Sequence, residues 1–143
     1  MANPDYADFT TNPYNPFFLN SNENPALVMV TPLLNGKNYH SWARAMRMGI
    51  ESKNKVMFLD GNLPQPAPDD ILYAPWKRCN NLVLSWIQHS TEESIAKSIL
   101  WIDSAAEAWK DLQDRFSQGD IFRIAELQEE FYHFSQGNLD ISE

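Results

Sequence analysis

Residues 38–50 read NYHSWARAMRMGI and carry the clearest periodic pattern in the chain. Apolar side chains recur there at spacings of three and four residues, at Tyr39, Trp42, Ala43, Met46 and Ile50. This spacing places them on one face of an α-helix, which must pack against other elements to bury that face. The stretch therefore predicts an α-helical fold.

Four further helices are predicted on the C-terminal side of this stretch, each from an apolar period and a start signal. Their expected starts are Asp69 or Asp70, Thr91, Ser104 and Asp120. Pro75 fits only the first turn of a helix, so the regular part of the first of these four is expected to begin near that residue. Ser104 and Glu107 form a capping-box pattern at the start of another.

Two short apolar runs lead to more local expectations. Residues 56–59 are expected to form one short strand that follows the first predicted helix along the chain. Thr91 is expected to begin a short helix with Glu92 and Glu93 in its first turn, where acidic side chains suit the helix dipole. The apolar residues expected inside this short helix are Ile95, Ile99 and Leu100.

The N-terminal part of the chain lacks a helical period. Residues 1–26 hold four of the nine prolines and six asparagines, which favour turns over regular structure. They are predicted to form a flexible arm, although Tyr14, Phe17 and Phe18 could dock on a core. The predicted fold is all-α: a bundle of about five helices over residues 27–143, with an extended arm and at most a short strand pair.

Six aromatic residues are interpreted as core rather than as a ligand-binding box, because they fall on helical apolar faces. They are Trp42, Trp76, Trp86, Trp109, Phe116 and Phe131.

The charge distribution bears on possible partners. The chain has 11 basic and 19 acidic residues, a net charge of −8, which disfavours nucleic acid and anionic membranes as partners. Residues 37–55 nevertheless hold five basic residues and only one acidic residue. One interpretation is a solvated helix face; the other is a self-association face that meets the acidic half of another copy. The residues of this candidate face are Arg44, Arg47, Lys53 and Lys55.

Catalytic and metal-binding patterns are absent from the sequence. The three histidines and the single cysteine, Cys79, are scattered, and the five glycines form no phosphate-binding loop. No enzyme, cofactor, metal or small-molecule substrate is therefore predicted. One cysteine favours a reducing compartment, and the absence of a signal peptide or a long apolar run predicts a cytoplasmic protein without a membrane span.

A set of ordered motifs resembles the N-terminal segment of plant Copia-type retrotransposon Gag polyproteins, from about residue 13 onward. The motifs include PLLNGKNY (32–39), SW (41–42), RAM (44–46), FLDG (58–61), WKRCN (76–80), LSWI (84–87), AEAW (106–109) and RFSQGD (115–120). Pro75 departs from the helix-favouring residue expected there.

The resemblance implies a helical Gag domain similar to the capsid N-terminal region, which associates with other Gag copies to build the particle. It implies no enzyme. In that family the chain continues into further helices and a zinc knuckle, so the domain is expected to be truncated at its C-terminal end, with weak or no RNA binding. The alternative is a host-retained helical protein-interaction module derived from Gag, with no role in particles.

Overall fold

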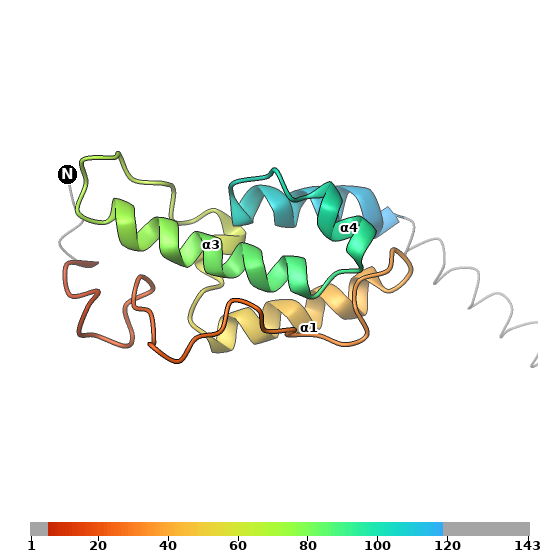
Figure 1. Ribbon diagram of the computed structural model, residues 1–143, viewed down its shortest axis with the longest axis horizontal. Coiled ribbons are helices and arrows are strands. Elements are labelled where there is room, and N and C mark those ends of the chain that lie inside the picture. Colours follow the sequence, from red (N-terminus) through yellow and green to blue (C-terminus); the bar gives the residue numbers. More distant parts are fainter. Residues whose placement is uncertain (1–5, 119–143) are drawn as a thin grey trace, which may run out of the picture.

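A computed structural model describes residues 6–118 of the chain (Figure 1). The helices are α1 (Tyr39–Ser52), α2 (Met57–Asp60), α3 (Tyr73–His89), α4 (Glu93–Ser98) and a further helix over residues 105–118. Within the described residues, β pairing is limited to one isolated parallel bridge, between Leu34 and Thr91. The all-α prediction is confirmed.

Helix α1 has the face that its sequence predicts, because Tyr39, Trp42, Met46 and Ile50 are all buried. The turn before it is closed by the side chain of Asn38. The Asn38 amide donates to the Leu33 carbonyl at 3.0 Å, and its oxygen accepts from the Asn35 N–H at 3.0 Å. Helix α1 thus begins directly from a hydrogen-bonded turn.

The prediction of a short strand at residues 56–59 is wrong, because residues 57–59 lie in helix α2 and Val56 is its N-cap. The N–H of Phe58 donates to the Lys55 carbonyl and that of Leu59 to the Val56 carbonyl, at 3.0 and 2.9 Å. Gly61 then ends the helix with a φ of 73°, in the left-handed region that favours glycine. A run of four apolar residues contains too little period to distinguish a strand from a helical turn.

Helix α3 lies at the centre of the fold and packs against both α2 and α4 (Figure 1). Pro75 is its third residue, in the first turn, where the lost backbone donor has no intrahelical acceptor. Nine residues of α3, on more than one side of the helix, are buried.

Helix α4 begins at Glu93, later than predicted, because the preceding residues pair with the chain before α1. The Leu34 N–H donates to the Ser90 carbonyl, and the Glu92 N–H donates to the Leu34 carbonyl, both at 3.0 Å. Ile99 is buried as expected. The prediction for Leu100 is wrong: α4 ends at Ser98, so Leu100 falls in a turn and its side chain is 53% exposed.

The helix over residues 105–118 begins at the predicted cap. Ser104 Oγ accepts a hydrogen bond from the Glu107 N–H at 3.3 Å, which satisfies one free donor of the first turn. Ala105, Ala108 and Leu112 are buried against the other helices. The helix predicted from Asp120 lies outside the described residues.

Residues 6–26 are irregular and packed against the helices. Phe17 is buried, 6.0 Å from the Phe58 ring on α2, and Tyr6 packs edge-on against it at 5.2 Å. The indole N–H of Trp86 on α3 donates to the Asn24 carbonyl at 2.9 Å. Part of the segment that was expected to be an arm therefore contributes to the core, whereas Tyr14 is exposed.

Candidate interaction surface

The predicted basic residues of helix α1 have different surroundings. Arg47 forms a two-pronged ion pair with Asp60 of α2, with both N–O distances at 2.9 Å. That carboxylate raises the pKa of the Arg47 guanidinium. Arg44 is exposed and forms no ion pair with another residue in the range 6–118.

The two lysines that follow α1 tie the N-terminal segment to the helices. Lys53 pairs with Glu23 at 3.2 Å and lies over the Trp86 ring at 5.9 Å. Lys55 is only 4% exposed, and its ammonium donates to the Phe18 carbonyl at 2.7 Å. Burial lowers the pKa of the Lys55 ammonium. Three of the four cations of the candidate face are thus engaged within the chain.

The aromatic residues that were predicted as core divide by depth. Trp42, Trp76 and Trp86 are buried, whereas Trp109 and Phe116 are partly buried and pack against the core. The rings of Trp42 and Trp109 lie 5.6 Å apart. Phe131 lies outside the described residues.

One tryptophan does not join the core. Trp101 follows α4 in the turn before the next helix and is 88% exposed, with exposed Leu100 beside it. Asp103, two residues further on, is also exposed. The sequence analysis did not predict that Leu100 and Trp101 form an exposed apolar surface. Their position between two predicted helices, outside the apolar face of either, was the signal that could have indicated it.

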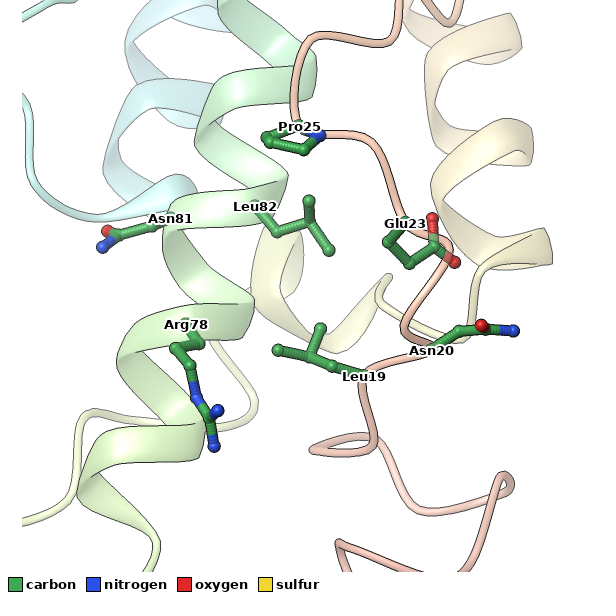
Figure 2. A pocket seen from close by; sticks show the side chains of 7 residues that line it. All are labelled: Leu19, Asn20, Glu23, Pro25, Arg78, Asn81 and Leu82. Carbon is green, nitrogen blue, oxygen red and sulfur yellow. The ribbon is translucent and has the colours of Figure 1, made fainter.

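A pocket of about 310 Å³ opens between the N-terminal segment and α3 (Figure 2). Leu19 and Leu82 project into the space between the two segments, and Pro25 lies above them in this view. The polar residues that line the pocket are Asn20, Glu23, Arg78 and Asn81.

The two charged residues at this pocket, Glu23 and Arg78, differ in whether an ion pair neutralises them. Glu23 is paired with Lys53, whereas Arg78 is exposed and has no ion-pair partner in the described part of the chain. The rim of this apolar pocket therefore offers a positive charge.

Two groups with catalytic potential, Cys79 and His89, are engaged in the fold. Cys79 is fully buried, and burial raises its pKa to about 11, so its thiol stays protonated near neutral pH. The imidazole Nδ1 of His89 lies 2.8 Å from the Ser85 carbonyl one turn earlier on α3. Between residues 6 and 118, no group of three or more His, Cys, Asp or Glu side chains could hold a metal ion.

Comparison with known protein families finds a match within the chain. Residues 20–67 match the Gag-polypeptide of LTR copia-type. The resemblance to copia-type Gag is thereby confirmed for the segment that includes α1 and α2. The matched segment contributes Asn20, Glu23 and Pro25 to the wall of the pocket, whereas Arg78 and Trp101 lie beyond the matched residues.

The search of curated proteins and the search of solved structures found no match. None of the helices formed by residues 6–118 is long and apolar enough to cross a membrane.

Proposed function

We propose that this chain is a structural, non-catalytic Gag-type domain that mediates self-association in the assembly of a retrotransposon particle. The observation that carries the proposal is the exposed pair Leu100–Trp101 on a fold whose other four tryptophans are buried or packed against the core. The match of residues 20–67 to copia-type Gag supports a structural role over a catalytic one.

The physical reason is the free energy of burying an exposed indole. Removing apolar surface from water is favourable by about 25 cal/mol of free energy for each Å². Tryptophan is also enriched among the residues that dominate binding energy at interfaces. The turn presents Trp101 without covering it, so association with a partner surface would bury it. This arrangement suits a protein that acts by contact with other copies.

The charge pattern makes a protein a better partner than RNA. The net charge is −8, and Arg47, Lys53 and Lys55 are held by contacts within the fold. Exposed Arg44 is the member of the candidate face that remains available to an acidic surface of another copy.

Sedimentation velocity over a wide concentration range, at low and high salt, tests the proposal. We expect reversible oligomers that grow with concentration and loosen with salt. A monomer at every concentration would overturn self-association and would favour the alternative, a helical module that binds other proteins.

A further inference from the structure

We propose that Trp101 of one copy inserts into the pocket formed by Leu19, Pro25 and Leu82 of another copy. This inference rests on the proposed self-association and names the two surfaces that carry it. The first argument is the state of the indole: Trp101 is 88% exposed and protrudes from a turn. Such a side chain has the exposure that an interface anchor needs.

The pocket has the size and the chemistry to receive an indole. Its volume of about 310 Å³ lies at the lower end of the range for pockets that hold drug-sized ligands, about 300–1,000 Å³. Leu19, Pro25 and Leu82 supply apolar contacts. Arg78 at the same pocket can lie against the aromatic face as a cation–π partner.

The charges around the two surfaces are complementary. Asp103 lies two residues after Trp101, is exposed, and forms no ion pair with any described residue. Arg78 at the pocket is likewise exposed and unpaired within residues 6–118, and the acidic Glu23 beside it is neutralised by Lys53. Insertion of Trp101 would therefore bring Asp103 of one copy toward Arg78 of the other.

The two surfaces lie on different sides of the molecule. In Figure 1 the connection that carries Trp101 lies above α3, whereas the N-terminal segment that forms the pocket wall lies below it. One chain therefore cannot fill its own pocket. The contact is head-to-tail, and such contacts extend into rings or open chains rather than stopping at a dimer.

The anchor is tested with Trp101→Ala in the full chain, compared with Tyr14→Ala as a matched exposed aromatic. We expect Trp101→Ala to weaken self-association by about 30-fold, which is the effect of losing an interface anchor of about 2 kcal/mol, and Tyr14→Ala to leave it unchanged. At a dilution at which the wild-type chain is monomeric, both variants should keep the wild-type melting temperature, because association no longer contributes to stability there. A marked drop for Trp101→Ala under these monomeric conditions would show that the indole is packed within the monomer and would overturn the proposal.

The pairing of the two surfaces is tested by a charge exchange. Arg78→Glu and Asp103→Arg should each weaken association, because each places like charges together across the contact. The double variant should restore it, because each contact again joins opposite charges. Failure of the double variant to restore association would overturn the pocket assignment. So would association that Arg78→Glu leaves intact, as a symmetric contact of Trp101 with Trp101 would give.

The outcomes separate the two proposals. Wild-type oligomers that Trp101→Ala leaves intact would overturn the insertion and leave self-association standing. A wild-type chain that stays monomeric would overturn self-association, and the insertion with it.

Discussion

At the scale of single residues, the same charge can serve the fold or remain available to a partner. Arg44 and Arg47 lie three positions apart on α1, yet only Arg47 reaches a carboxylate, that of Asp60 on α2. Both were predicted as one face from the sequence. The difference arises from α2, whose helical form brings Asp60 to Arg47.

This pair provides a matched test. Arg47→Glu should lower the free energy of unfolding by up to about 1 kcal/mol, because it replaces a partly exposed ion pair with two like charges. Arg44→Glu should leave the melting temperature of the monomer, measured at high dilution, unchanged while weakening self-association at higher concentration. Equal melting temperatures in the two variants would contradict a stabilising role for the Arg47–Asp60 pair.

The raised pKa of the buried Cys79 thiol predicts how the free energy of unfolding changes at alkaline pH. Its pKa is raised by burial from 9.0 to about 11, so the unfolded chain loses the thiol proton first. The stability that this group contributes is fully present below pH 9 and is lost as the pH rises from 9 to about 11. The loss should be about 2–3 kcal/mol.

Unfolding by denaturant at several pH values between 8 and 11 measures this loss, and Cys79→Ala is the control. The variant should lose less stability than the wild type over the same interval, because the titrating thiol is gone while the other groups remain. Parallel curves for the two proteins would refute the assignment to Cys79.

At the scale of elements, one buried side chain connects α3 to the helix over residues 105–118. Asn80 is buried on α3; its amide donates to the Asp103 carbonyl at 2.6 Å, and its oxygen accepts from the Ala105 N–H at 2.8 Å. It thus satisfies backbone groups on both sides of the helix start. Buried polar groups of this kind are costly to leave unpaired.

We predict that Asn80→Leu lowers the free energy of unfolding by about 2–5 kcal/mol, because it leaves two backbone groups without these partners. Thermal or denaturant unfolding measures the change. Asn81→Leu is the matched control, since Asn81 is the exposed neighbour on the same helix and should change stability by less than about 0.5 kcal/mol. Equal effects at the two positions would contradict the bridging role.

At the scale of the whole molecule, the N-terminal segment is part of the packed structure. Phe17 is buried against Tyr6 and Phe58, and Lys55 and Trp86 donate hydrogen bonds to carbonyls of the same segment. These contacts join residues that are far apart in the sequence. The same N-terminal segment also forms one wall of the pocket in Figure 2.

Phe17→Ala should therefore lower the free energy of unfolding by about 3–5 kcal/mol, the usual cost of removing a buried aromatic ring. Tyr14→Ala, in the same segment but 89% exposed, should have almost no effect. Unfolding curves for the two variants compare them directly. A negligible effect of Phe17→Ala would show that the segment does not contribute to the stability of the fold.

The sequence by itself determined the helical class, the buried face of α1, the place of Pro75 in the first turn of α3 and the cap at Ser104. It also indicated the copia-type Gag resemblance that residues 20–67 confirm. These features depend on the period of apolar residues and on local hydrogen bonding, which neighbouring residues specify within a few positions.

Only the tertiary structure decided the conformation of residues 56–59, the burial of Lys55 and the exposure of Leu100 and Trp101. Each depends on which distant segment lies opposite. Lys55 is buried because the carbonyl of Phe18, 37 positions earlier, reaches it, and the pocket exists because residues 19–25 lie beside α3. Such long-range packing combines many weak contacts, and no short stretch of sequence encodes it.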